Sequence, residues 1–174
     1  KEAAEISDHI PWKWWKAEKE NKAQAFMEVV DILHFWISAW LKGSNKQSVL
    51  DDVEDWVAQF KDEAENDLNN AVDLAVYFGV RASIALSNIS PVDYDFHFTK
   101  NLATVLALTE MLRYTVEDLS NWYIGKCALN FFRQDMGYKT DNYVKKWDET
   151  YEDNHYLEII IDNAKTQNIT LEPK

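Results

Sequence analysis

The chain has 174 residues, of which 47% are apolar and 14% aromatic, a size and composition that suit one folded domain and exclude a disordered chain. Its formal net charge of −12 disfavours binding to nucleic acid phosphates, and no apolar run reaches the about 18–20 residues of a membrane span. Cys127 is the only cysteine, so no disulfide can form within the chain, and we expect a reducing, cytoplasmic location.

Long helices are expected first at the N-terminal end. Glycine and proline, which interrupt helices, number only four and three in the chain. Residues 1–9 read as the end of a helix that stops near Pro11. A longer apolar helix is predicted for residues 23–41, ended by Gly43 and Ser44.

Three further helices are predicted in the middle of the chain. Residues 48–68 begin with SVLD, which resembles a capping box, and carry apolar residues at helical spacing. The next helix spans residues 71–88 and is broken by Pro91, so we expect residues 91–98 (PVDYDFHF) to form a loop or short turn. The helical pattern resumes over residues 99–113.

The C-terminal part combines two predicted helices with one long loop. TVED at residues 115–118 repeats the capping signal and begins a helix that runs to about residue 134. The periodicity then vanishes over residues 135–154, a polar and aromatic stretch of the kind that functional loops have. A last helix is predicted for residues 155–164. The fold class is therefore all-α.

Two pairs of carboxylates, each with members three residues apart, are the first candidate site. They are Glu2 with Glu5, and Glu28 with Asp31. A single pair with this spacing is common on solvated helices, but the second pair lies on a helix apolar nearly all round, where buried acids need Lys, Arg or metal partners. Two pairs on consecutive antiparallel helices would form a cage of four carboxylates. Such oxygen donors, without a His or Cys cluster, suit Mg²⁺ and a phosphate-bearing substrate.

A basic helix face is the second candidate site. Lys126, Asn130 and Arg133 recur at helical spacing and share one face, and Tyr138 and Lys139 follow in the loop. Arginine forks and lysine charges bind phosphate oxygens well. The alternative is an ordinary amphipathic helix whose basic face pairs with acids elsewhere. Together with the carboxylate pairs, phosphate binding is the better interpretation.

The ordered motifs resemble one family. Residues 2–38 contain E-x-x-E, WKWWK and EVVDILHF, and residues 123–154 contain Y-I-x-K-x-x-L-N-x-x-R-Q-x-x-G-Y-K-x-x-x-Y followed by E-D-N. These blocks are similar to those of the dimeric all-α dUTPases, which belong to the all-α nucleoside triphosphate pyrophosphohydrolases. The blocks cover about two fifths of the chain, and their ordered combination is far more specific than any single piece.

The resemblance implies a fold and an activity. It implies one helical-bundle catalytic domain over residues 1–174, with a helical insert at 44–115 and with the N-terminal helical segment of the family missing before residue 1. It implies a Mg²⁺-dependent dUTP diphosphatase that hydrolyses dUTP to dUMP and pyrophosphate, also accepts dUDP, and so prevents uracil incorporation into DNA. It further implies a homodimer.

The resemblance also assigns roles to residues. The Mg²⁺ ligands would be Glu2, Glu5, Glu28 and Asp31. Either Glu5 or Glu28 would position the attacking water or take its proton. The phosphate- and sugar-binding residues would be Lys126, Asn130, Arg133, Tyr138, Lys139 and Asn154. The base-binding residues would be Trp14, Trp15 and His34, although each of these alone is more often a core or interface residue.

Two other functions stay open on the sequence. One is a related pyrophosphohydrolase that acts on dCTP or another nucleotide. The other is a non-catalytic helical module for dimerisation or partner binding. WKWWK and the long C-terminal motif favour the dUTPase over the first alternative, and the four acids together with Arg133 disfavour the second.

Overall fold

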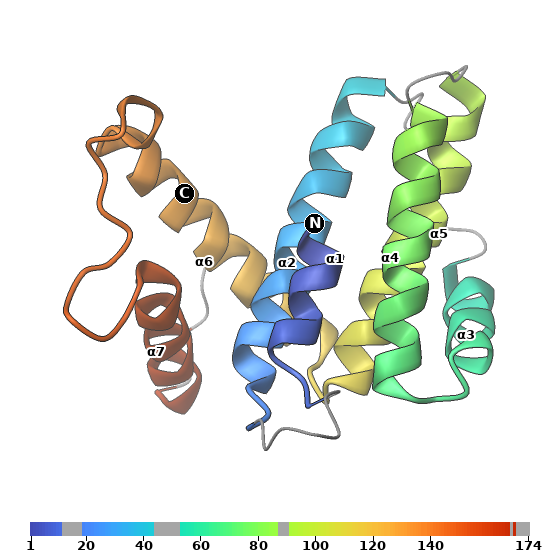
Figure 1. Ribbon diagram of the computed structural model, residues 1–174, viewed down its shortest axis with the longest axis horizontal. Helices are drawn as coiled ribbons and strands as arrows, with labels where there is room; N and C mark the ends of the chain where they lie inside the picture. The colour runs from blue at the N-terminus through green and yellow to red at the C-terminus, as the bar shows by residue number, and fades with distance from the viewer. Residues whose placement is uncertain (12–18, 44–52, 87–90, 168, 170–174) are drawn as a thin grey trace. The chain divides into compact units, whose positions relative to one another are not determined.

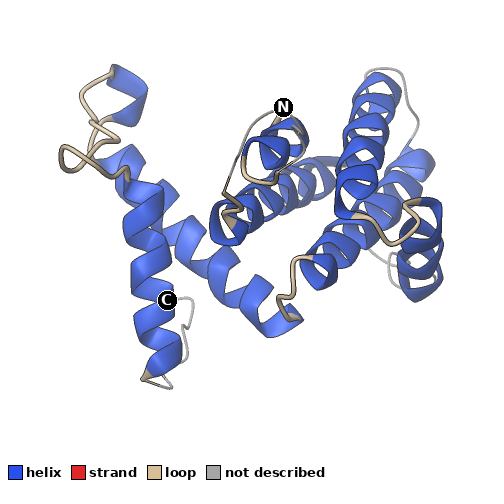
Figure 2. Ribbon diagram, turned by 60° about the horizontal axis from the view of Figure 1, so that its bottom comes forward, coloured by secondary structure: helices blue, strands red, loops and turns tan. Residues whose placement is uncertain are grey.

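The computed structural model describes residues 1–11, 19–43, 53–86, 91–167 and 169, and of these it describes only the backbone of residues 42–43, 82–86 and 91–96. It is 77% helical, and its described residues form seven α-helices and no strand, which confirms the all-α fold class (Figures 1 and 2). Within this described part, no helix has both the length and the apolar character that crossing a bilayer requires. The chain divides into two compact units, Lys1–Val116 (unit 1) and Glu117–Lys174 (unit 2). The prediction of one domain stays a prediction.

Unit 1 is a helical bundle organised around its last helix. Its elements are α1 (Glu2–Glu5), the short 3-10 helix η1 (Ile6–Asp8), α2 (Lys22–Gly43), α3 (Val53–Glu63), α4 (Leu68–Leu86) and α5 (Pro91–Met111). Helix α5 contacts α2, α3 and α4, and the short α1 contacts both α2 and α4. Figure 1 shows α1, in dark blue, lying along α2.

Helix α2 supplies much of the core of unit 1, as its apolar sequence predicts. Phe26, Val29 and Val30 are fully buried, and the Phe26 ring stacks on Tyr114 with centroids 3.9 Å apart. Ile6 in η1 is also fully buried and anchors the N-terminal turn against this core. Because apolar burial fixes both segments, the polar side chains between the buried positions keep fixed directions.

The expected loop at residues 91–98 is wrong, because α5 begins at Pro91 and continues to Met111. Proline in the first turn of a helix loses no hydrogen bond, since the first N–H groups have no partner within the helix, and its fixed φ suits the helix. Pro91 therefore starts a helix rather than ending one. The capping pattern predicted at residues 48–51 lies outside the described residues.

Unit 2 is a pair of helices joined by a long loop. Helix α6 (Val116–Asp135) leads through the 3-10 helix η2 (Tyr138–Thr140) to α7 (Asp153–Thr166). The two helices approach closely at Gly125, where an added Cβ would lie 2.9 Å from Leu157 Cδ1 and 3.3 Å from Ile161 Cδ1. Leu157 and Ile161 are buried, so the helix pair has its own small apolar contact.

Candidate functional site

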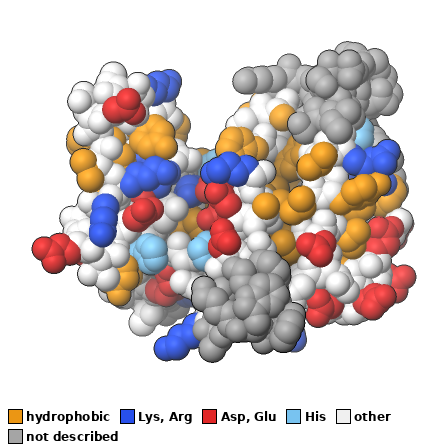
Figure 3. Space-filling model, in the orientation of Figure 1, with side chains coloured by type: hydrophobic (Ala, Val, Ile, Leu, Met, Phe, Trp, Pro, Cys, Tyr) orange, Lys and Arg blue, Asp and Glu red, His pale blue; other side chains and the backbone are white. Residues whose placement is uncertain are grey.

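The first helix and the long α2 bring three of the predicted acids together. Glu2 and Glu5 lie on α1, Glu28 lies on α2, and all three are partly buried. Each offers a carboxylate oxygen, and these oxygens lie within 4.8 Å of one another. Figure 3 shows acidic side chains at the surface over these helices. The arrangement concentrates negative charge in one place, which a divalent cation would neutralise.

Two members of this acidic group, Glu5 and Glu28, have a basic neighbour of their own. Lys1 Nζ lies 2.7 Å from Glu5 Oε1, and His9 Nε2 lies 3.7 Å from Glu28 Oε1. Burial, together with the hydrogen bond to Glu5 and its charge, raises the pKa of Glu2 to about 7. The hydrogen bonds from Glu2 and from Lys1 lower the pKa of Glu5. Below about pH 7, the pair of Glu2 and Glu5 therefore holds one proton, which the two carboxyl groups share through a hydrogen bond.

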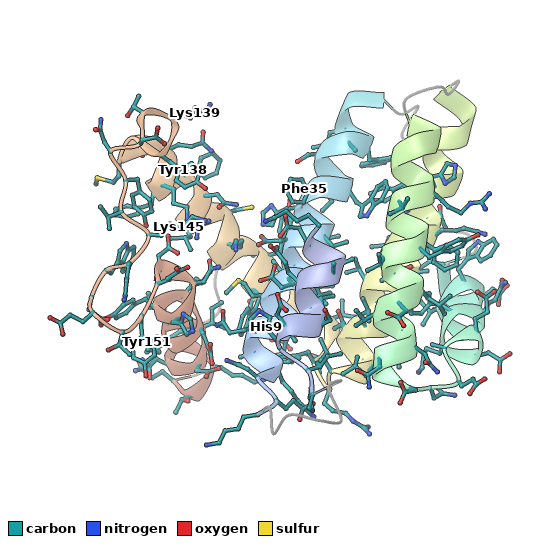
Figure 4. The ribbon with its side chains drawn as sticks, viewed as in Figure 1. His9, Phe35, Tyr138, Lys139, Lys145 and Tyr151 are labelled. Carbon is teal, nitrogen blue, oxygen red and sulfur yellow. The ribbon has the colours of Figure 1, made fainter. Side chains whose placement is uncertain are left out.

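The other predicted residues of α2 lie beyond the group of three acids. Asp31 is partly buried one helical turn after Glu28 and is not a member of that group. His34 follows after a further three residues and is also partly buried. Phe35, labelled in Figure 4, is 62% exposed, so α2 reaches solvent-accessible surface of unit 1 at this position. Trp14 and Trp15 lie outside the described residues.

His9 is a neighbour of the acids that the sequence interpretation missed. It caps η1, where its N–H donates to Ile6 O, and its carbonyl accepts a hydrogen bond of 2.8 Å from Asn21 N (Figure 4). These backbone bonds hold its ring near Glu28. No local spacing reveals this contact, because Glu28 lies nineteen residues after His9 on another helix.

The predicted basic face of α6 forms a connected network in unit 2. Lys126, of which only 2% is exposed, donates from Nζ to Asn154 Oδ1 at 3.1 Å. Arg133 donates from Nη2 to the same oxygen at 3.0 Å and from Nη1 to Asn130 Oδ1 at 3.2 Å. The structure thus brings together four of the residues predicted to bind phosphate and sugar.

The centre of this network is an acid to which the sequence interpretation gave no role. Asp153 is fully buried and accepts two hydrogen bonds from Arg133, 2.8 Å from Nε and 2.7 Å from Nη2. Tyr143 Oη donates to it at 2.8 Å. Burial acts to raise the pKa of Asp153, but the bonds from Arg133 and Tyr143 outweigh it and hold that pKa below its ordinary value. The E-D-N motif contained Asp153, but spacing alone does not reveal its partner.

Tyr138 and Lys139 lie at the start of the loop, in η2, and both are exposed. The Tyr138 ring centroid is 6.1 Å from that of Tyr143, and Lys145 Nζ lies 5.7 Å from the Tyr138 centroid (Figure 4). Tyr138 therefore joins the aromatic side of the loop, whereas Lys139 extends outward with its charge accessible to a ligand.

Comparison with known families gives one match. Residues 1–138 match the family model described as dUTPase, which is more than three quarters of the chain. A search of curated proteins returned no match. The matched range contains the three clustered acids and the cationic face of α6, and it ends before Tyr143, Asp153 and Asn154.

Proposed function

The chain belongs to the dUTPase family, and we propose that it hydrolyses dUTP to dUMP and pyrophosphate, and dUDP to dUMP and phosphate, in a Mg²⁺-dependent reaction. The family match makes it a dUTP diphosphatase with a nucleotide substrate. The proposed dependence on Mg²⁺ is supported by the group of three carboxylate oxygens that lie within 4.8 Å of one another.

The residues of unit 1 fit a hard divalent cation. The donors of Glu2, Glu5 and Glu28 are all oxygens, and Asp31 is one turn away on the same helix as Glu28. We propose that these four acids hold Mg²⁺. The raised pKa of Glu2 indicates that the group favours an added positive charge, which a proton supplies when no cation is bound. When bound, Mg²⁺ polarises phosphoryl oxygens and lowers the pKa of a coordinated water.

The proposed proton acceptor is Glu5 or Glu28. Glu5 is held by hydrogen bonds with Glu2 and Lys1, which favour its ionised form at neutral pH. Glu28 faces His9 at 3.7 Å, so a proton taken by Glu28 has a neighbouring imidazole to receive it. Either carboxylate would orient the attacking water and take its proton as the phosphoanhydride bond breaks.

The proposed phosphate-binding residues are those of unit 2. Lys126 and Arg133 carry the charge, and Asn130 and Asn154 are bonded to them through their side-chain oxygens. Lys139 adds an exposed charge in the loop. These groups would stabilise the negative charge that develops on the leaving pyrophosphate. We propose base recognition by Trp14, Trp15 and His34 on the family resemblance alone.

Three broader predictions accompany this function. A homodimer and the absence of nucleic acid binding stay predictions from the family resemblance and from the net charge of −12. A cytoplasmic location stays a prediction from the single cysteine.

A nucleotide panel tests the proposal. The protein is incubated with Mg²⁺ and dUTP, dCTP, dTTP or dATP, and pyrophosphate release is measured, with EDTA in place of Mg²⁺ as the control. We expect release from dUTP that EDTA abolishes, and in a parallel incubation with dUDP we expect release of phosphate. Release from dCTP instead would support the related pyrophosphohydrolase. Silence with all four nucleotides would overturn the enzymatic proposal.

A further inference from the structure

The Arg133 guanidinium is held on three sides by acceptor oxygens of unit 2. Asp153 accepts bonds from Nε and Nη2 in a bidentate pair, Asn154 Oδ1 accepts from Nη2, and Asn130 Oδ1 accepts from Nη1. The Arg133 side chain is only 11% exposed, and Asp153 is fully buried. A planar fork bound at this many points has one orientation, which a lysine at the same place would not have.

This fixed guanidinium also fixes the two neighbouring amides. The side-chain oxygens of Asn130 and Asn154 both face cations, since Asn154 Oδ1 accepts from Lys126 as well as from Arg133. Turning either amide around would set its NH₂ group against the guanidinium, donor against donor. The Nδ2 groups must therefore point away from Arg133. Both asparagines are partly exposed, so these NH₂ groups are within reach of a ligand that has acceptor oxygens.

Asp153 is in turn fixed from the loop side. Its side chain accepts the hydroxyl of Tyr143 at 2.8 Å, and Tyr143 Oη accepts from Trp147 Nε1 at 2.9 Å. Its backbone N–H donates to Lys145 O at 2.9 Å, beside the isolated bridge between residues 146 and 152. One buried carboxylate thus ties α6, α7 and the connecting loop to a single arginine.

We propose that Asp153 is a positioning residue for the dUTPase reaction: it orients Arg133, and through Arg133 it aims the NH₂ groups of Asn130 and Asn154 at phosphate oxygens of the nucleotide. The inference rests on the function proposed above. Asp153 lies beyond residue 138, where the match to the family model ends, so the role comes from its contacts and not from that match. Tyr143 is a second positioning residue that acts through Asp153.

The first test exchanges one acceptor oxygen of Asp153 for an NH₂ group. Asp153→Asn must place that group against Tyr143 or Arg133, so we expect kcat/KM for dUTP to fall about 100-fold, as for other small misplacements of binding groups. Asp118→Asn is the matched control, because Asp118 is also a buried acid of unit 2 and is paired with Lys165 at 2.7 Å. The control should keep kcat/KM within about twofold of the wild type. An Asp153→Asn value within that range would overturn the proposal.

A second test separates positioning from a purely structural role. Asp153 and Asn130 are linked through Arg133, so their effects should be coupled. We expect Asn130→Ala in the Asp153→Asn background to lower kcat/KM much less than it does in the wild type. Multiplicative losses would show that Asp153 does not act through Arg133 on Asn130, and would overturn the proposal. Near-UV circular dichroism of each variant checks that its aromatic side chains keep their packing.

If Asp153→Asn does not fold, a milder variant tests the proposal in its place. Tyr143→Phe removes one hydroxyl that donates to Asp153, and Tyr156→Phe removes one that donates to Asp148. We expect about a tenfold rise in KM for dUTP from the first change and none from the second. Equal effects would overturn the role of the network. A wild-type protein without dUTP hydrolysis would instead overturn the proposed function, so the two failures are distinguishable.

Discussion

Unit 1 brings carboxylate oxygens of three acidic residues within 4.8 Å of one another, whereas unit 2 buries an arginine and an aspartate that neutralise each other. Like charges brought together raise the free energy of the folded state until a cation joins them. A buried pair with its hydrogen bonds satisfied is complete without a ligand. The acidic group therefore suits binding of an added ion, and the Arg133 network suits positioning of groups before a ligand arrives.

Because of this difference, removing one charged side chain should have opposite effects on the stability of the fold in the two units. Removing a carboxylate from the acidic group relieves repulsion and should not lower the stability of the fold. Removing one partner of the Arg133–Asp153 pair leaves a buried charge without compensation and should lower stability strongly. Both changes should lower activity, so stability measurements distinguish the two regions where activity measurements do not.

The largest expected effect is on activity in unit 1. Glu28→Gln removes a proposed metal ligand, and we expect kcat/KM for dUTP to fall by about 1,000-fold or more, because metal-ion stabilisation contributes several kcal/mol. The unfolding temperature should stay level or rise. Glu54→Gln, an exposed acid in the first turn of α3, is the control: it should leave kcat/KM unchanged and lower stability by no more than about 1 kcal/mol, the contribution of an acid at a helix N-terminus. Retained turnover in Glu28→Gln would remove the basis for the metal site.

The largest expected effect on stability is in unit 2. Arg133→Met leaves the fully buried Asp153 carboxylate without its cation, and we expect the free energy of unfolding to fall by about 3–5 kcal/mol. Urea denaturation followed by circular dichroism measures this change. A loss below about 1 kcal/mol would mean that the pair is solvated in solution, and the contrast between the two units would then disappear.

The pH dependence of the same variant has a definite sign. In the folded wild type the pKa of Asp153 lies below its ordinary value. Its contribution to stability is therefore present at neutral pH, and it is lost as the pH falls from the ordinary pKa of aspartate to the lower pKa of the folded state. In Arg133→Met burial dominates and raises that pKa, so stability should instead fall as the pH rises from acid toward neutral. Denaturation at pH 4 and at pH 7 compares the two slopes.

A smaller effect is expected from Mg²⁺ itself. An ion that binds only the folded acidic group at 100 times its dissociation constant stabilises the fold by about 2.7 kcal/mol. Thermal unfolding should therefore shift upward with Mg²⁺ and return with EDTA in the wild type, and the shift should be much reduced in Glu28→Gln. An equal shift in both proteins would place the ion elsewhere.

Glu2 adds a pH dependence to this metal effect. Its folded pKa of about 7 lies above the ordinary 4.5, so without metal its contribution to stability is full below the ordinary value and declines as the pH rises to about 7. Its proton also competes with the ion. We expect the Mg²⁺-induced shift to be larger at pH 8 than at pH 6, and a shift that grows toward acid pH would contradict this role for Glu2.

The helices were predictable where their pattern is local. The apolar run of α2 and the capped pattern of α6 predict both helices to within a few residues of their observed bounds. Pro91 misled the prediction because proline both ends helices and suits their first turn. Its effect depends on whether the helix lies before or after it, and α5 lies after it. Helix α7 begins at Asp153, two residues before its predicted start, since the residue that begins it is fixed by contacts with α6.

The candidate site was predictable only in part, because only some of its contacts lie within one local sequence pattern. The two carboxylate pairs predicted a group of four acids, and the structure brings Glu28 to Glu2 and Glu5 but leaves Asp31 outside this group. Spacing could not reveal the pair of Arg133 with Asp153, which are twenty residues apart and joined by a loop without periodicity. Contacts across such a loop depend on tertiary packing, which no local pattern encodes.

The smallest expected effects compare two glycines, one in each unit. Gly137, which follows α6, has φ of +83°, and an added Cβ would lie 2.9 Å from Thr140 Oγ1, so Gly137→Ala should lower stability by about 1–2 kcal/mol. Gly79 lies within α4, where no described atom is within 4 Å of an added Cβ, so Gly79→Ala should raise stability by about 1 kcal/mol.

The two glycine variants also test whether the loop after α6 keeps the conformation in which Tyr143 reaches Asp153. Because Gly137 begins the segment that carries Tyr143, strain there should raise KM for dUTP as well as lower the unfolding temperature, whereas Gly79→Ala should leave KM unchanged. If Gly137→Ala were as stable as the wild type, the left-handed turn would not persist in solution. Asp153 would then lack the fixed loop from which Tyr143 reaches it, and the positioning of Arg133 would depend on the helix pair alone.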